Sequence, residues 1–488
     1  MKNTDWYDVL AIGMPFVVIT VLYSSELLDP AILPKFLGWG AYLLFLGFFL
    51  ATRKNTGSTV VLDFKSLLLP LLSYLIIAAL SMVNSKNLAE GAFEWYKGFF
   101  LFTTVWLLIS VFRYRQSFLI DGVTVAMIAL SFVAAGFGLH QFLEISDKAG
   151  FSHSESYAIA GTFAHRNLYA EVLCLSLPFN VYGFYRFHNS LRWFSLVAAY
   201  LTAFIIVILM SRAVWLSVIA GFLGVLFVYL ISVYRVGQLK HLVNKYYPFV
   251  LKYGFAVILV IIGAITLFTQ LNSVTALQKQ VNSIFELNLS YGSVGQRIQL
   301  WQKSLAIIQD NYLLGVGIGD WEQALLKQGN EGMLSPNNKT FFQRPHNDFL
   351  WVFSESGIFA FLAYAAVFAL AVLKLIQQLS KVKSGYDSGL IYALIFSIIG
   401  YVVYALFSFP KERIEHQVIL GFILALTWLV QDKGISKGGP STPLKRRYFW
   451  LIFTLILVGF GAYLGFKRLN AEIHVKNALE ARSKQNHQ

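Results

Sequence analysis

The sequence predicts an all-α, polytopic membrane protein with about 12 to 13 transmembrane helices. Hydrophobic residues make up 57% of the 488 residues and charged residues only 13%, whereas a soluble domain carries roughly 25% charged residues. Apolar runs near the length of a bilayer-spanning helix cover most of the chain. Hydrocarbon offers no partner to backbone polar groups, so each run is predicted to be a helix, which satisfies them internally.

Each predicted span is one of these apolar runs. The first run is not expected to be a cleavable signal peptide, because it lacks a basic start followed by a small-residue cleavage site. The predicted spans cover residues 8–23, 36–51, 66–82, 96–112, 118–143, 165–185, 194–210, 213–233, 249–268, 349–373, 389–407, 416–430 and 449–466.

Lysine and arginine residues gather in alternate loops, which predicts the topology. Arg113 and Arg115 follow the fourth span, and Lys445, Arg446 and Arg447 follow the twelfth, whereas the intervening short loops are poorer in basic residues. By the positive-inside rule the even-numbered spans end in the cytoplasm, so the amino terminus is cytoplasmic and the carboxyl terminus outside. The net charge of +14 therefore indicates topology, and no nucleic-acid partner is expected.

One polar segment breaks the pattern of short loops and divides the chain. Residues 269–348 separate nine predicted spans in residues 1–268 from four in residues 349–466, and a polar tail follows at 467–488. The segment is too long for a plain connector. The same count of spans places it outside the membrane, in the periplasm of a bacterium, with the helices that it contains.

An amphipathic helix is predicted over 294–309, where Ile298, Trp301, Leu305 and Ile308 recur at helix spacing. The glycine-rich stretch 311–321 follows it. Its glycines suggest either a phosphate-cradling loop or a tight turn that closes the helix. No strand precedes them, so the tight turn is favoured. The single Cys174 excludes a disulfide framework.

Two arginines occupy positions where a permanent charge is unusual. Arg212 lies between two apolar runs that join almost without a loop, and burying it near a helix centre costs ~2.5–3.5 kcal/mol. The alternative is an arginine that snorkels at a helix end. Arg297 begins the amphipathic helix, either as a solvated residue or as part of an anion site completed by backbone N–H groups.

A histidine stands at the junction between the polar segment and the tenth span. His346 follows Arg344 and precedes Asn347 and Asp348, which are expected to cap the next helix. The alternatives are a surface histidine in a capping turn and an acid–base group that accepts a proton near neutral pH. Arg344 is expected to contact the substrate at the same junction.

No metal site and no cofactor are expected. Asp310, Asp320 and Glu322 lie in the outer segment, but no pair of ligands has the helical spacing of a zinc site and no cysteine joins them. A hard-cation site assembled in three dimensions is the alternative.

Four motifs together resemble one known family. They are the segments 161–170, 211–215, 297–319 and 346–357, and their order and spacing are similar to those of the O-antigen ligase and O-antigen polymerase family of bacterial membrane glycosyltransferases. The similarity covers roughly residues 60–430. The sequence departs from the family at His165-Arg166, where small or amide residues are usual, and Arg166 is expected to add positive charge to the substrate site.

The resemblance implies a glycosyltransferase fold of the C type in the inner membrane, with its active site facing the periplasm. Such enzymes transfer a glycan from undecaprenyl diphosphate to an acceptor hydroxyl, with inversion and without metal. The acceptor is a glycan, a lipid A core or a protein, and membrane lipids surround the enzyme. His346 matches the essential histidine of the family, and Arg212 and Arg297 match its essential arginines.

Several functions remain open at this point. Ligation to a lipid A core, polymerisation of repeat units and transfer of an oligosaccharide to protein are all compatible with the family. A transporter of lipid-linked glycan is the alternative from another class. It explains the spans and Arg212 but not the polar outer segment, and no internal symmetry of the kind found in many transporters is visible.

The topology predicts that residues 269–348 face outward. Single cysteines introduced at Ser283 and at Asn330 in a Cys174→Ser background should react with a membrane-impermeant maleimide in intact spheroplasts. Labelling that appears only after lysis would place this segment in the cytoplasm and contradict the topology.

Overall fold

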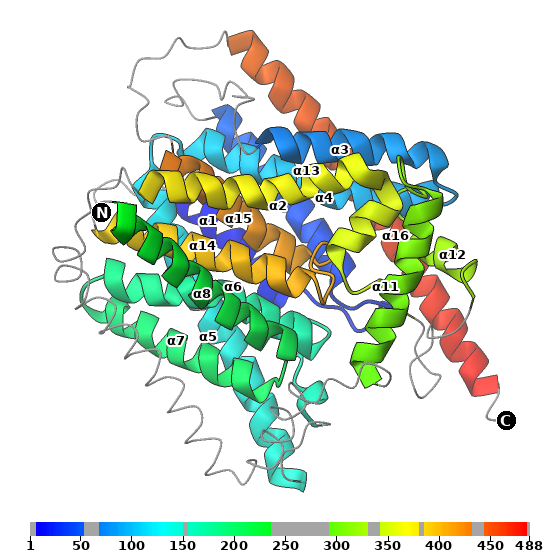
Figure 1. Ribbon diagram of the computed structural model, residues 1–488, viewed down its shortest axis with the longest axis horizontal. Coiled ribbons are helices and arrows are strands. Elements are labelled where there is room, and N and C mark those ends of the chain that lie inside the picture. Colours follow the sequence, from blue (N-terminus) through cyan, green and yellow to red (C-terminus); the bar gives the residue numbers. More distant parts are fainter. Residues whose placement is uncertain are drawn as a thin grey trace. The chain divides into compact units, whose positions relative to one another are not determined.

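The computed structural model describes residues 6–52, 68–149, 155–235, 292–329, 342–379, 385–431 and 444–485. Every regular element in these ranges is a helix (Figure 1). Eight of the helices described are long and apolar enough to cross a membrane. The predicted all-α, multi-pass membrane class is therefore confirmed.

The helices of the described residues fall on the predicted spans, and the last of them continues through the predicted polar tail as far as Gln485. The ninth predicted span, 249–268, lies outside these residues. The helices that fall on the other predicted spans are α1 (Trp6–Val21), α2 (Ile32–Thr52), α3 (Leu68–Ser81), α4 (Leu88–Phe112), α5 (Gln116–Ala149), α6 (Arg166–Arg186), α7 (Ser190–Ile208), α8 (Arg212–Arg235), α13 (Asp348–Leu379), α14 (Gly385–Ala405), α15 (Ile414–Gln431) and α16 (Leu444–Gln485).

The outer polar segment contributes two further helices. Helix α11 (Gly292–Asp310) covers the predicted amphipathic helix, and the short α12 (Trp321–Leu326) follows the glycine-rich stretch. Two 3₁₀ turns, η1 (Met82–Asn84) and η2 (Glu155–Ala158), precede α4 and α6.

The chain divides into two compact units. Unit 1 comprises Met1–Gly122, Trp301–Val367 and Phe409–Gln488, and unit 2 comprises Val123–Leu300 and Phe368–Ser408. Helices α5, α11 and α13 each contribute residues to both units.

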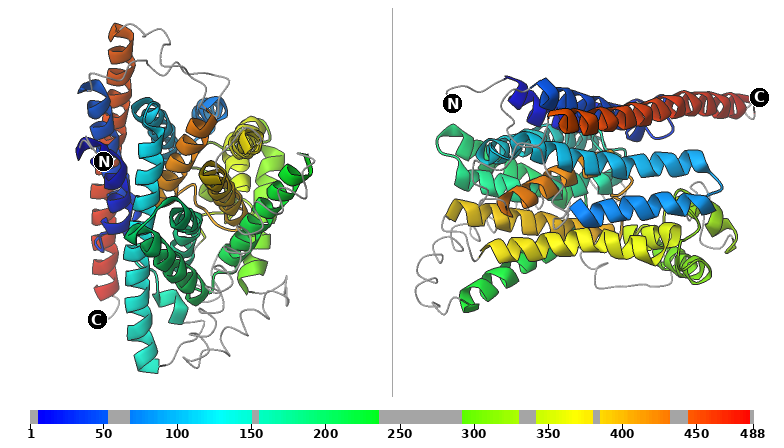
Figure 2. Two further views of the ribbon diagram at one scale, coloured as in Figure 1. Left: turned by 90° about the vertical axis from the view of Figure 1, so that its left-hand side faces the viewer. Right: turned by 90° about the horizontal axis from the view of Figure 1, so that it is seen from above.

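Unit 1 is organised around α2, which packs against α1, α4, α15 and α16. Figure 2 shows α16 running alongside α2. The rings of Phe36 and Phe100 stack with centroids 4.8 Å apart. The Trp39 indole N–H donates to Thr104 Oγ1 at 2.9 Å, so these two buried polar groups are paired as an apolar environment requires.

Unit 2 is organised around α6 and α14, which pack against each other. Helix α7 covers α6, and α8 lies along α14 (Figure 1). Gly221 and Gly224 of α8 allow this close approach, because a Cβ at either position would lie within 3 Å of Phe396 or Ile399. Small residues permit such close contacts between membrane helices.

The glycine-rich stretch after α11 is a junction between three segments of unit 1. Its first attachment is to α13. Val316 N–H donates to Ser354 O at 3.0 Å and Gly317 N–H donates to Glu355 O at 2.9 Å. Helix α13 is interrupted at Gly357, whose φ is 77°, and Ile358 N–H then donates to Tyr312 O at 3.0 Å.

The second attachment of this glycine junction is to the start of α4. The Asn84 side-chain amide donates to Gly315 O at 3.0 Å. The Asp320 carboxylate accepts the backbone N–H groups of Lys86 and Asn87. The predicted tight turn is present, and the N–H groups of Gly315, Val316, Gly317 and Ile318 are already bonded to protein oxygens.

Gly357→Ala should lower the free energy of unfolding by about 2–5 kcal/mol. A positive φ costs a non-glycine residue roughly 1–2 kcal/mol, and the clash of a buried atom adds about 1–3 kcal/mol. A Cβ at Gly357 would lie 1.9 Å from Leu313 O. The measurement is thermal and denaturant unfolding of the purified protein in detergent.

Gly329→Ala is the matched control, because Gly329 also has a positive φ of 87° but its Cβ would meet only Lys303 Nζ at 4.0 Å. It should cost only the conformational penalty. Equal losses for the two variants would mean that close backbone packing at the junction contributes nothing.

Candidate functional site

Three arginines of unit 2 lie at or near helix amino termini. Arg166 is the first residue of α6 and Arg212 is the first residue of α8. Arg297 lies in the second turn of α11. Helix amino termini carry partial positive charge and attract anions, so guanidinium groups there add positive charge where it is already in excess.

Arg166 is held in place by its neighbours. Its guanidinium lies 3.5 Å from the centroid of the Tyr157 ring and donates to Ser156 Oγ. His165 adopts the extended conformation of an amino-terminal cap, and its Nδ1 accepts the N–H of Asn167 at 3.1 Å. The departure from the family at His165-Arg166 thus forms a capped helix start with one buried cation.

Arg212 begins α8 immediately after a tight connection from α7. Met210 in this connection has a φ of 49°, in the left-handed region that few residues adopt. The Trp215 indole N–H donates back to Ile206 O at 3.1 Å. The connection is therefore short and fixed on both sides, which explains why so little polar sequence separates the two apolar runs.

Arg212 repels each of the other two arginines. Burial lowers the pKa of Arg297, and repulsion from Arg212 lowers it further, whereas Glu171 and Tyr157 oppose the change. Arg212 also repels Arg166. We call Arg166, Arg212 and Arg297 the arginine cluster. Its electrostatics favour a polyanionic ligand with fixed geometry, because arginine presents bidentate donors and stays charged.

His346 lies in unit 1, just before α13. Its backbone has a φ of 53°, and its ring packs edge-on against Phe409 with centroids 5.0 Å apart. The Trp301 indole N–H of α11 donates to Pro345 O at 3.0 Å. As predicted, Asn347 caps α13, since its Oδ1 accepts the N–H groups of Phe349 and Leu350 at 3.0 Å.

A buried network of charges supports the His346 segment. The Lys411 ammonium lies 3.7 Å from Glu94 Oε2 and 3.9 Å from the centroid of the Trp351 ring. Lys411 N–H donates to Asp348 Oδ2 at 2.8 Å. Glu94 also forms an ion pair with Lys97.

Arg344 belongs to the same network. It forms an ion pair with Glu412, and its guanidinium lies 5.1 Å from the Trp351 ring. Burial alone would lower the pKa of Arg344, but the carboxylates of Glu412 and Glu94 raise it above its usual value. The same balance raises the pKa of Lys411, where Tyr74 and Glu94 outweigh burial.

A second buried cluster continues along the connection between α14 and α15. Arg413 donates to Asp29 Oδ2 at 2.7 Å and to Glu415 Oε1 at 3.2 Å. Lys35 of α2 lies 3.5 Å from Glu415. The pKa of Asp29 is lowered, because Arg413 and two backbone N–H groups outweigh its burial.

Sequence reasoning missed the residues of this connection. All but one of residues 411–417 are polar or charged, and all of them are buried. The sequence does carry a signal for these residues, namely a dense run of charge at the start of an apolar span. Such a run is unfavourable in a membrane unless each charge has a partner.

The predicted site residues thus fall into two groups. Arg166, Arg212 and Arg297 come together in unit 2, whereas His346 and Arg344 lie close to each other in unit 1. Among the residues that the structure describes, no three His, Cys, Asp or Glu side chains gather at metal-binding distances. Asp320, one of the acidic candidates, instead bonds the backbone before α4.

Glu94→Gln should lower the free energy of unfolding by about 3–5 kcal/mol, because it leaves Lys97 and Lys411 buried without their shared carboxylate. The control is Glu144→Gln. Glu144 is 61% exposed and pairs with an exposed His140, so this change should cost less than about 1 kcal/mol. Unfolding of both variants in detergent is the measurement, and a Glu94→Gln protein as stable as the control would contradict the pairing.

Comparison with known proteins adds one finding to this geometry. The family model described as O-antigen ligase matches residues 197–365, a region that contains Arg212, Arg297, Arg344 and His346 but not Arg166. No curated protein matches the chain. The match confirms the family resemblance that the motifs predict, and residues 197–365 are therefore similar to the O-antigen ligase family.

Proposed function

We propose that the protein transfers a glycan from an undecaprenyl diphosphate carrier to an acceptor hydroxyl on the periplasmic side of the bacterial inner membrane. The arginine cluster is the observation that carries this proposal. Three guanidinium groups beside helix amino termini, with Glu171 as the opposing carboxylate, suit a ligand with several negative charges. A diphosphate is such a ligand.

The chemistry of glycosyl transfer requires such a site. As the bond between the anomeric carbon and the phosphate oxygen breaks, both bonding electrons go to the diphosphate, whose negative charge rises. Fixed donors aimed at that charge lower the barrier, because they act without reorganisation. Arginine also needs no proton transfer to remain cationic. The reaction in this proposal therefore needs no metal and no cofactor.

His346 serves the acceptor in the proposed mechanism. A neutral imidazole accepts the proton of the acceptor hydroxyl while the oxygen attacks the anomeric carbon, and attack opposite the leaving diphosphate inverts that centre. The bond from Trp301 to Pro345 and the ring of Phe409 hold the segment that carries the imidazole. A fixed orientation matters, since proton transfer requires hydrogen-bond distance to the acceptor oxygen.

Contact of Arg344 and Arg166 with the substrate stays a prediction. Arg344 has a positioning role in addition, because its ion pair with Glu412 holds the chain two residues before His346. Arg166 adds the third cation to the arginine cluster and is expected to strengthen binding of the donor.

Three related activities share this donor and differ in their acceptor. A ligase uses a lipid A core, a polymerase uses another glycan, and an oligosaccharyltransferase uses a protein hydroxyl. Identification of the molecule that becomes labelled when membranes receive lipid-linked glycan separates them. The family match favours all three over a transporter.

The roles of His346 and the arginines predict different kinetic defects. His346→Ala should bind lipid-linked donor nearly as well as the parent and transfer its glycan about 10²–10⁴-fold more slowly, the usual loss for a general base. Arg212→Lys and Arg297→Lys should weaken donor binding and transfer together, because lysine keeps the charge but lacks the bidentate fork.

The measurement pairs donor affinity with single-turnover transfer on the same membranes, in the presence of excess chelator. Arg192→Lys is the control, because Arg192 is a cation of unit 2 that packs over Phe184 outside the arginine cluster. Loss of donor binding in His346→Ala, together with normal transfer in Arg212→Lys, would show that the roles are assigned wrongly.

A further inference from the structure

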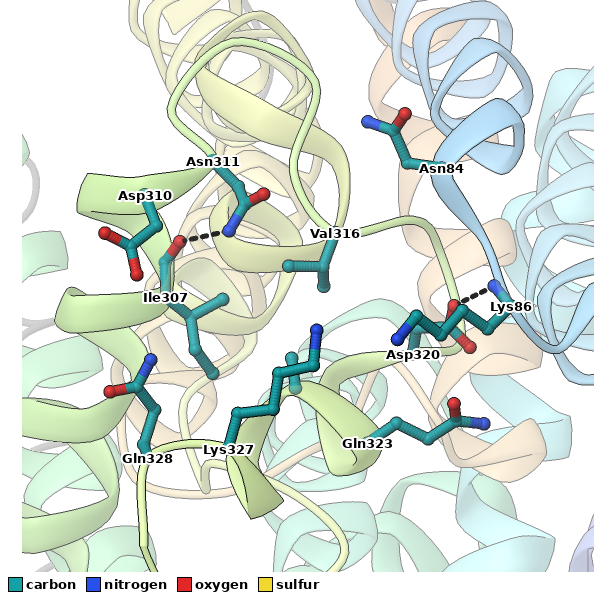
Figure 3. Close-up of a pocket in the computed structure, with 11 residues that line it drawn as sticks. Asn84, Lys86, Ile307, Asp310, Asn311, Val316, Asp320, Gln323, Lys327 and Gln328 are labelled. Carbon is teal, nitrogen blue, oxygen red and sulfur yellow. Dashed lines mark hydrogen bonds between the residues drawn. The ribbon is translucent and has the colours of Figure 1, made fainter.

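A polar cavity of about 370 Å³ lies in unit 1 beside the glycine junction (Figure 3). Its walls are the end of α11, the stretch 311–320, α12 with the turn that follows it, and the residues just before α4. No member of the arginine cluster lines the cavity. His346, Arg344 and the buried ion pairs around Lys411 do not line it either.

Two lysines converge on this cavity. Figure 3 shows the side chains of Lys86 and Lys327 pointing toward each other across it. The Lys86 side chain is the main cause that lowers the pKa of Lys327. Neighbouring ammonium groups repel each other, and an anion placed between them relieves the repulsion.

The remaining charges of the cavity limit the charge of that anion. The Asp320 carboxylate already accepts two backbone N–H groups at the start of α4, and Asp310 lies exposed at the edge. The two aspartates equal the two lysines in formal charge, so a ligand with several negative charges would not be balanced in the cavity. The cavity suits a monoanion such as a carboxylate better than a dianion.

The neutral walls are suited to a sugar ring. Asn311 donates its amide to Ile307 O at 3.1 Å, which fixes the side chain and leaves its amide oxygen as an acceptor. Gln323 and Gln328 bring further amide groups to the wall. Apolar side chains of Ile307, Val316 and Ala324 also line it. An apolar surface with a few placed polar groups is typical of small-molecule sites.

We propose that this cavity is a glycan subsite that binds a sugar residue bearing one carboxylate. The inference rests on the proposed function, because it assigns the sugar to the glycan that the enzyme handles. Along α11 the cavity residues Ile307 and Asp310 lie six and nine positions beyond Trp301, which bonds to Pro345 next to His346. At 1.5 Å per residue this is about 9–14 Å, so the bound sugar is not the one at the reacting bond.

The test measures binding to the purified full-length protein in detergent. The probe is a fluorescent oligogalacturonate, whose sugars each carry a carboxylate, and its methyl ester serves as the uncharged probe of equal length. The parent should bind the acid at least 10-fold more tightly than the ester. Lys86→Gln and Lys327→Gln should each weaken binding of the acid about 10-fold, the usual effect of losing a charge-assisted hydrogen bond, and should leave the ester unaffected.

Lys467→Gln is the control, because Lys467 is an exposed lysine of unit 1 on α16, outside the cavity. Equal binding of acid and ester, or an equal effect of Lys467→Gln, would overturn the subsite. Inorganic phosphate at matched ionic strength should not displace the acid probe, and displacement at equal concentration would reduce the cavity to a simple anion site and overturn the proposal.

Failure of the subsite and failure of the proposed function are separable. Probe binding needs no turnover, and it should be the same in His346→Ala as in the parent. If the parent transfers lipid-linked glycan but does not distinguish acid from ester, the subsite alone is wrong. If the probe binds as expected but the parent transfers no glycan from the lipid carrier, the proposed function is wrong and the carboxylate site remains.

Discussion

The pairing of buried charge is the constraint on which unit 1 depends. Glu94 lies within an apolar helix and Lys411 within the buried part of a connection, residues 410–413, and neither charge is tolerable there alone. Their contact at 3.7 Å fixes the connection between α14 and α15 against α4. Through Lys411 the same connection bonds Asp348, the first residue of α13, and so determines where the His346 segment stands.

A buried network of ion pairs adds little to stability but fixes the orientation of the segments that it joins. Replacing a buried ion pair by apolar residues often does not destabilise a protein, so the charges here serve to specify one arrangement of the connection. The glycine junction acts at the other end of the same segment. There the N–H groups of Val316 and Gly317 donate to the backbone of α13. These bonds hold α13 on the carboxyl-terminal side of His346.

The sequence predicted those parts of the structure that depend on local pattern. Apolar runs predicted the helices, because spanning length and composition are sufficient in a bilayer, and Asn347 was recognisable as a cap from its place before α13. The convergence of Arg166 on Arg212 and Arg297 was not predictable in the same way. It depends on how α6, α7 and α8 pack, and the bare sequence could suggest only that each cation was out of place.

The buried connection shows a different limit of sequence reasoning. A charged run before an apolar span usually indicates the point where the chain leaves the membrane, so the predicted span at 416–430 does not include residues 411–415. Their partners are Asp29, Lys35, Glu94 and Asp348. These lie more than 60 positions away, and no local periodicity can reveal a pairing of that range. The same holds for Asn84 and Asp320 at the glycine junction.

If the arginine cluster binds the diphosphate of a lipid-linked glycan, as proposed, it also binds the carrier after the glycan has been transferred. The spent carrier bears more negative charge than the donor, so in the proposed reaction it competes with the donor for the arginine cluster. The pace of glycan assembly then depends on how quickly the surrounding membrane removes and recycles the empty lipid, as well as on the enzyme.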